Sequence, residues 1–330
     1  MVSSPVPQHA VRTLNVRTLQ AQDLCGLSTQ VLVMSAEQML QRIGAQSKLL
    51  DERDERIVSQ ARAIKFMHVD ETPVNMLDPG AGKAKRACIW AHAHGRFDAP
   101  PGVANDFCVG RAAKYPIAFL GEWSGTLVRD ECSAHDSVAR LHERMAAGCL
   151  AHARRKFDER IKDNRSSVAT QAVQRIAMIY RVEHEARELS AEDRLAAKQT
   201  RAQLLWDGFF VWLKLARSRF ADGSAIARAL DDSLNHWAAL TTHRQDGRLP
   251  VDNNLIENLL RPWAMCRKAW RYCGSERASQ RAAVAMSLLM SAKLNGHDPW
   301  AYLKDVLTGL PTHLNGRIEK LLPHRWQPLA

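Results

Sequence analysis

The segment AIKFMHVDETPV, Ala63 to Val74, carries the pattern from which the fold can be inferred. Residues 63–69 form a short β-prone run that leads directly into Asp70, and a Thr-Pro turn signal follows. Burying a carboxylate next to such a run costs free energy unless a hydrogen bond, an opposite charge or a metal ion compensates for it. The segment therefore predicts a strand that ends on an acidic side chain.

The chain beyond this segment continues in the same way. A turn cluster at residues 78–82 and a β-prone run at residues 86–94 predict a hairpin. Residues 125–129, GTLVR, predict a further strand that ends on Asp130, and residues 148–151 predict a short strand that leads into a basic helix. Strands with acids at their ends, mixed with helices, indicate an α/β core.

Helical periodicity dominates residues 158–250. Beyond them, Asp252 or Asn253 is a candidate N-cap for a helix that runs to about Leu260, where Pro262 limits it. We expect a helical N-terminal segment, the first part of an α/β core, a helical insertion, the final part of the core and a C-terminal tail, at residues 1–62, 63–157, 158–250, 251–310 and 311–330.

The composition narrows the class of protein. The 330 residues are 46% hydrophobic and 25% charged, which excludes a disordered chain, a fibrous repeat and a disulfide-rich miniprotein. The 46 basic and 35 acidic residues give a net charge of +11, which favours a polyanionic partner such as nucleic acid. With no apolar membrane span, no signal segment and seven scattered cysteines without C-x-x-C spacing, we expect a cytoplasmic protein with reduced thiols and no membrane partner.

Three acids are candidates for a metal site. Asp70 and Asp130 each end a β-prone run, and Glu257 lies in the first turns of a predicted helix. Carboxylates from two strand ends and a helix can hold two divalent cations ~3.5–4 Å apart for phosphoryl displacement, and Mg²⁺ prefers such oxygen ligands. The alternatives are a turn cap at Asp70, a loop acid at Asp130 and a surface ion pair between Glu257 and Arg261.

Basic residues are concentrated near the C-terminal end of the chain and after residue 153. Six of them stand between residues 261 and 281 against the single acid Glu276, and aromatic residues are interleaved with them. Such residues can neutralise phosphates and stack on unpaired bases, although a solvated helix face is the alternative. The expected basic DNA contacts are Arg154, Arg155, Lys156, Arg261, Arg267, Lys268, Arg271 and Arg277.

Five motifs, in order, resemble those of the insertion-sequence 66 family of bacterial transposases. They are HVDETPV at 68–74, CLAHARRKF at 149–157, DNN with EN and RP at 252–262, RKAW followed by GSER at 267–277, and AKLNGHDP at 292–299. The resemblance implies a DDE transposase with a ribonuclease-H-like mixed sheet, a large helical insertion before the last acid and a helical C-terminal region.

The resemblance also implies roles for individual residues. Asp70 would bridge two Mg²⁺ or Mn²⁺ ions, and Asp130 and Glu257 would each hold one. Water activated at the metals would cut the end of the element, and the resulting 3′-hydroxyl would attack target DNA without a covalent enzyme intermediate. Asn253 and Asn254 would orient the Glu257 carboxylate, contact a DNA phosphate or only cap the helix.

The chain departs from the family pattern at three places. The segment around the second acid reads RDECSAH, which makes Asp136 an alternative to Asp130, and Cys266 replaces a glycine. Residues 1–60 contain one cysteine, Cys25. We therefore expect the zinc-binding module of the family to be absent, the chain to be N-terminally shortened and no zinc to be bound.

Two further pairs of residues are interpreted as structural. Cys149 and His152 have Cys-x-x-His spacing, but two ligands do not make a structural zinc site, so a packed thiol and a hydrogen-bonded imidazole are expected. His92 and His94 share one face of a predicted strand without acids or cysteines at ligand spacing.

Three functions remain open from the sequence. The first is an insertion-element transposase that binds element ends and target DNA, as a homo-oligomer and with accessory proteins of the same element, in the nucleoid. The second is a catalytically inactive DNA-binding remnant of such a transposase. The third is a ribonuclease-H-like nuclease that cleaves without strand transfer.

Overall fold

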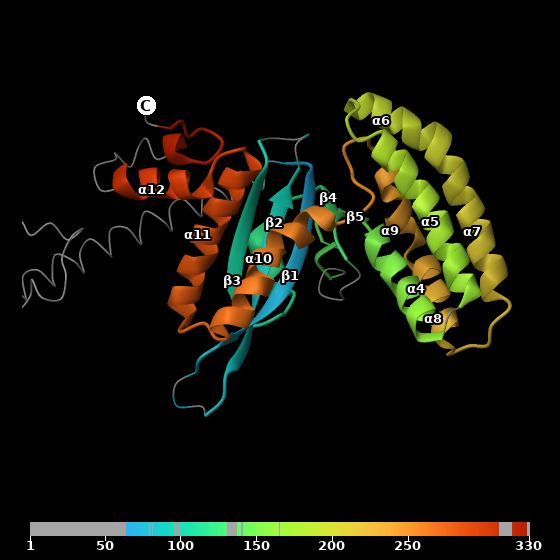
Figure 1. Ribbon diagram of the computed structural model, residues 1–330, viewed down its shortest axis with the longest axis horizontal. Helices are drawn as coiled ribbons and strands as arrows, with labels where there is room; N and C mark the ends of the chain where they lie inside the picture. The colour runs from blue at the N-terminus through green and yellow to red at the C-terminus, as the bar shows by residue number, and fades with distance from the viewer. Residues whose placement is uncertain are drawn as a thin grey trace, which may run out of the picture.

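The computed structural model describes residues 64–78, 80, 82–95, 97, 100–130, 137–139, 141–164, 166–309 and 319–328. The expected N-terminal helical segment and the alternative acid Asp136 lie outside these residues, as does much of the expected tail. Within them, a sheet with its covering helices stands beside a separate bundle of helices (Figure 1).

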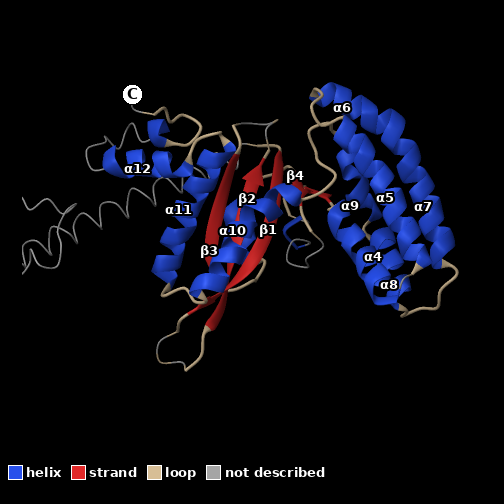
Figure 2. Cartoon of the chain, viewed as in Figure 1, coloured by secondary structure: helices blue, strands red, loops and turns tan. Residues whose placement is uncertain are grey.

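Five strands form one mixed sheet in the order β3-β2-β1-β4-β5 (Figure 2). They are β1 (Phe66–Met76), β2 (Lys85–His94), β3 (Gly102–Cys108), β4 (Thr126–Val128) and β5 (Met145–Ala147). The β1–β2 and β2–β3 pairs are antiparallel, and the β1–β4 and β4–β5 pairs are parallel. The sheet and its helices confirm the expected α/β, ribonuclease-H-like fold class.

Two strands differ from the sequence prediction in their bounds. β1 does not end at Asp70 but continues through Pro73 to Met76. β4 pairs only with residues 66–68 of β1, so on this side the rest of β1 forms an edge of the sheet. Pro73, which lacks an N–H group, is tolerated at this edge. The strand expected at 148–151 lies at Met145–Ala147, and Leu150 already begins a helix.

Helices cover both faces of the sheet. α10 (Asn254–Trp270) packs on one face through apolar residues, and α12 (Pro299–Gly309) contributes to the core on the other. α11 (Glu276–Leu294) runs along β3, where Ser287 and Ser291 accept hydrogen bonds from its main chain. α2 (Lys114–Leu120) lies between β3 and β4 in the chain.

The segment between β5 and α10 forms a helical bundle with its own core. It comprises α4 (Leu150–Asn164), α5 (Ser167–Glu185), α6 (Ala191–Ala197), a π-helical turn (Lys198–Ala202), α7 (Gln203–Arg217), α8 (Ala225–Asn235), α9 (Trp237–Thr241) and a 3-10 turn (Thr242–Gln245). The core of the bundle includes Leu150, Phe157 and Trp206, so helical packing begins before residue 158. Each helix among the described residues is too short or too polar to cross a membrane.

α10 extends further than the sequence predicts. It was expected to end before Pro262, but it runs through this proline to Trp270. Proline removes one helical hydrogen bond and strains the preceding turn, yet the buried side chains of Leu259 and Trp263 hold both halves of the helix against the sheet. Tertiary packing therefore outweighs the local preference.

Candidate active site

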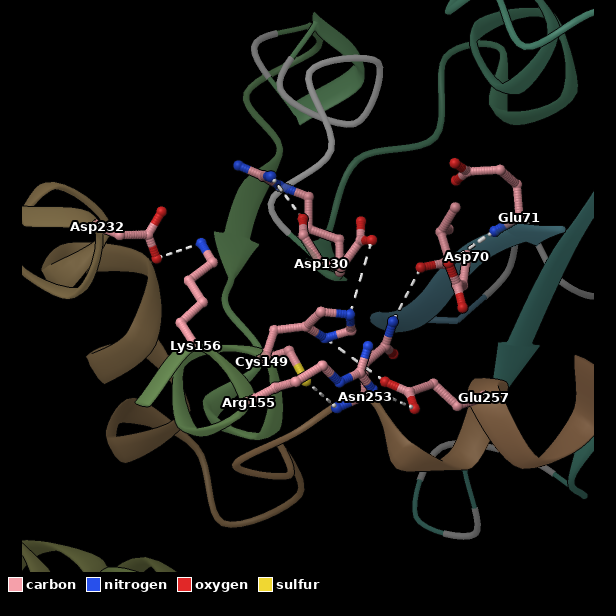
Figure 3. Close-up of polar contacts among 12 residues, drawn as sticks. Asp70, Glu71, Asp130, Cys149, Arg155, Lys156, Asp232, Asn253 and Glu257 are labelled. Carbon is pink, nitrogen blue, oxygen red and sulfur yellow. Dashed lines mark hydrogen bonds and ion pairs between the residues drawn. The ribbon is translucent and has the colours of Figure 1, made fainter. Parts of the chain in front are cut away.

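The register between β1 and β4 brings two of the predicted acids to the same part of the sheet. His68 on β1 pairs with Val128 on β4 in the parallel ladder. Asp70 and Asp130 each follow this pair by two residues. Because neighbouring strands lie ~4.8 Å apart, the two acids lie close to one another just beyond the last β1–β4 pair. Figure 3 shows them next to one another.

The third acid reaches this place from α10, and a histidine stands beside it. Glu257 lies in the first turn of α10, and its Oε1 is 3.5 Å from Nδ1 of His152. Nε2 of the same imidazole is 4.0 Å from Oδ2 of Asp130. The His152 ring, carried by α4, therefore lies between the second and third acids.

An open pocket of about 400 Å³ brings Asp70, His152 and Glu257 together; Asp130 does not line it and reaches it through its contact with His152. It is lined by Asp70, Glu71, Thr72, His152, Arg155, Glu257, Leu260, Arg261 and Ala264. Arg155 Nη2 lies 3.6 Å from Glu257 Oε2. The pocket therefore has both carboxylates and guanidinium groups in its lining, an arrangement that suits a cation-bridged phosphate.

Asn253 fixes the position of α10 relative to β1. Its side chain is completely buried, and Nδ2 donates to the Val69 carbonyl at 3.0 Å. A buried side chain cannot reach a DNA phosphate, so the expectation of a phosphate contact is wrong for Asn253. Asn253 occupies the N-cap position of α10, as the sequence predicts, but its side chain makes no capping hydrogen bond; Asp252 accepts from the Asn254 main-chain N–H at 3.1 Å.

The residues in and beside the pocket supply ligand atoms for a divalent cation. Oε1 of Glu257 is buried and has no hydrogen-bond partner among the described residues, so it offers an unused lone pair. Cys149, His152 and Glu257 bring ligand atoms within 4.8 Å of one another. Burial raises the pKa of the Cys149 thiol to about 12, and its Sγ accepts a hydrogen bond from the Asn253 main-chain N–H at 3.2 Å. The pocket itself is lined by the carboxylates of Asp70 and Glu257 and by the His152 imidazole, a set that suits Mg²⁺ or Mn²⁺.

The predicted basic residues fall into two groups. Arg155 and Arg261 border the pocket, and Lys268, Arg271 and Arg277 are exposed on or after α10. The other three, Arg154, Lys156 and Arg267, bind acidic side chains or main-chain oxygen atoms of the chain itself.

Each of these three side chains has a partner within the chain. Arg154 pairs with Asp158, Lys156 pairs with Asp232, and Arg267 donates to Pro73 O at 2.7 Å. Arg267 therefore ties α10 to β1.

Two residues at the site were not assigned to it from the sequence. The sequence predicts a hydrogen-bonded structural imidazole at His152, although its Cys-x-x-His spacing at the start of a helix is a usable signal for a site residue. Glu71, next to Asp70, has a buried side chain that pairs with Arg111. Its main-chain N–H donates to Asp70 Oδ1 at 2.8 Å and so orients the first acid. An Asp-Glu pair in a strand gives little indication of this division of roles.

Comparison with protein families gives two matches. The family model described as Transposase IS66 family matches residues 26–281, and the model described as IS66 C-terminal element matches residues 287–324. The first match covers the sheet, the helical bundle and the three acids.

Three curated relatives, all from Sinorhizobium fredii, resemble the chain over most of its length. The uncharacterized protein y4jD is 34% identical over 83% of this chain and 56% of its own length. The uncharacterized protein y4hP is 28% identical over 89% of this chain and 56% of its own. The uncharacterized protein y4qI is 31% identical over 83% and 53%, respectively. The chain spans about half the length of the curated relatives it matches.

Proposed function

The chain belongs to the Transposase IS66 family, and from this premise we propose that Asp70, Asp130 and Glu257 form a two-metal site that cuts and joins DNA. The observation that supports the proposal is that Asp70 on β1 and Glu257 on α10 border one open pocket with His152, and that Asp130 at the end of β4 lies 4.0 Å from the same histidine. The acids are far apart in the sequence, yet two of them border one pocket and the third contacts the histidine of that pocket.

The three acids would share the ions as follows. Asp70, oriented by the Glu71 N–H, would hold the two ions together with Asp130 and Glu257. Bound Mg²⁺ or Mn²⁺ would supply charge neutralisation at the phosphate and activation of the attacking oxygen. His152 would act as a positioning residue, because its two nitrogens face Asp130 and Glu257 and limit their movement.

The chemistry would consist of two displacements at phosphorus. In the first, water attacks a phosphodiester at the end of the element, and the bond to the 3′-oxygen breaks to leave a 3′-hydroxyl. In the second, this hydroxyl attacks a target phosphodiester, a new P–O bond forms, and a target 3′-hydroxyl leaves. Neither step requires an enzyme nucleophile, so the chain needs only to bind, orient and neutralise.

DNA would reach the pocket along the exposed side of α10. Glu257, Arg261 and Lys268 stand at i, i+4 and i+11, so they share one face of this helix. Arg155 borders the same pocket from α4. These cations would contact phosphates on either side of the scissile bond and give affinity without sequence preference.

The test is a strand-cleavage and strand-transfer assay with Mg²⁺ or Mn²⁺ on DNA that carries the ends of the element. We expect Asp70→Asn and Glu257→Gln to abolish both products while DNA binding is retained. Glu122→Gln, which changes an exposed acid outside the pocket, serves as the matched control and should be active.

The same assay decides between the alternatives. DNA binding without any cleavage by the unmodified chain would favour a catalytically inactive remnant. Cleavage without joined products would favour a nuclease. Cleavage that persists in Asp70→Asn would overturn the two-metal site. Element ends, target DNA and accessory proteins of the element are the partners that this function would require.

A further inference from the structure

Helix α7 carries an apolar stripe on the outer side of the bundle. Leu204, Val211 and Leu215 are 74%, 58% and 57% exposed. Gly208 stands between them, and a Cβ atom at this position would meet nothing within 4 Å. The four residues follow one another at spacings of four, three and four, so they form a single line along the helix. Figure 1 shows α7 on the side of the bundle away from the sheet.

Among the residues that the structure describes, this stripe takes no part in a core cluster. The opposite face of α7, with Trp206, Phe209 and Leu213, packs into the core of the bundle. The spacing of the exposed line is that of the a and d positions of a coiled coil, which bind a second helix. We propose that α7 pairs antiparallel with α7 of a second copy of this chain.

The shapes along the stripe are self-complementary in an antiparallel register. With a twofold axis between residues 209 and 210, Leu204 meets Leu215 of the second copy. In the same register Val211 meets Gly208 of the second copy, so the branched side chain of Val211 packs against a residue that has no side chain. A parallel pair would instead set Gly208 against itself and leave a gap in the middle of the contact.

The charges beside the stripe favour the same register. Asp207 faces Lys214 of the second copy on one side, and both residues are exposed. On the other side, Leu205 faces Trp212, and both are half-buried apolar residues that already border the stripe. In a parallel pair Asp207 would lie beside Trp212 and the opposite charges would not meet. Flanking charges of this kind set the partner and orientation of paired helices.

The contact would be a closed, twofold and rather weak dimer. One pair of helices of this length buries less than the ~1,000 Å² typical of stable interfaces, so the dimer would form in a concentration-dependent manner. The proposal depends only on α7 and not on the metal site, so it can fail while the proposed function stands, and the reverse.

The first test is the mass of the full chain in solution, measured by sedimentation over a range of concentrations. We expect the unmodified chain to pass from monomer to dimer, and Val211→Glu to stay monomeric throughout. Met178→Glu places the same charge on an exposed apolar position of α5 and should dimerise normally. An unmodified chain that remains monomeric at every concentration would overturn the proposal.

A charge exchange tests the register. Asp207→Lys alone or Lys214→Asp alone places like charges across the axis and should raise the dissociation constant of the dimer roughly fivefold or more, since two symmetry-related pairs change. The double variant Asp207→Lys with Lys214→Asp should restore it. Asp207 also pairs with Arg244 at 3.6 Å within the chain, so thermal unfolding is measured for each variant, and Lys214→Asp leaves that pair intact. A double variant no tighter than the single ones would exclude this register.

Discussion

The side-chain amide of Asn253 donates to the main-chain oxygen of Val69 at 3.0 Å, one residue before Asp70. Its Oδ1 lies 2.7 Å from Nδ1 of His68, and its own main-chain N–H donates to Cys149 Sγ at 3.2 Å. A single buried asparagine therefore joins β1, the start of α4 and the start of α10. These three elements carry two of the acids and the histidine of the pocket.

Replacing this asparagine should destabilise the protein. Asn253→Ala leaves the Val69 carbonyl and the His68 ring buried without their partner, which costs about 1–3 kcal/mol. Urea unfolding measures the loss. Asn254→Ala removes a neighbouring exposed amide and should stay within ~0.5 kcal/mol of the unmodified chain. Equal losses for the two variants would contradict the role of Asn253.

The buried histidines should make stability depend on pH below neutrality. Burial lowers the pKa of His68 to about 4, from an ordinary value of 6.5, although its hydrogen bond to Asn253 acts in the opposite direction. Between these two values the unfolded chain binds a proton that the folded chain does not. The free energy of unfolding is therefore complete above pH 6.5 and falls as the pH is lowered towards 4.

Urea unfolding at a series of pH values measures this slope. Burial also lowers the pKa of His243, to about 3, so this ring contributes with the same sign. His243→Gln should reduce the slope, whereas His142→Gln, at an exposed position, should leave it unchanged. A slope that is the same in His243→Gln would show that this histidine does not carry the effect.

The sequence predicted the strands that lead to Asp70 and Asp130 and the helix that carries Glu257. The structure brings these acids near His152, although β1 continues past Asp70 to Met76. The sequence was not sufficient for residues whose role depends on contacts between distant segments. The burial of Asn253 depends on how α10 packs against β1, which no local pattern encodes.

Helix bounds show the same limit. Pro262 gave a local signal to end α10, and packing of its neighbours against the sheet prevailed. For His152, the spacing to Cys149 drew attention to the pair as possible zinc ligands. Only the fold shows that the imidazole turns towards the acids while the thiol turns into the core.

The Cys149 thiol should be unreactive in the native protein. It is fully buried, and its raised pKa leaves almost no thiolate at pH 8. Iodoacetamide at this pH, followed by peptide mass spectrometry, should label the partly exposed Cys266 well before Cys149. Labelling in denaturant should remove the difference. Early modification of Cys149 in the folded chain would mean that the thiol is accessible.

Two arginines of α10 should respond differently to removal. Arg261 is exposed and borders the pocket, so Arg261→Ala should lower the magnitude of the slope of log affinity for DNA against log salt concentration by ~0.9, the value for one lost phosphate contact. Arg267 donates to Thr72 Oγ1 at 2.9 Å and to Pro73 O at 2.7 Å. Arg267→Ala should therefore lower the free energy of unfolding and leave the salt slope of the folded fraction unchanged. Fluorescence anisotropy with a DNA duplex at several salt concentrations, paired with urea unfolding, separates the two effects. If Arg261→Ala keeps the full slope, DNA does not follow this face of α10, and the path past the acids has to lie on the side of Arg155.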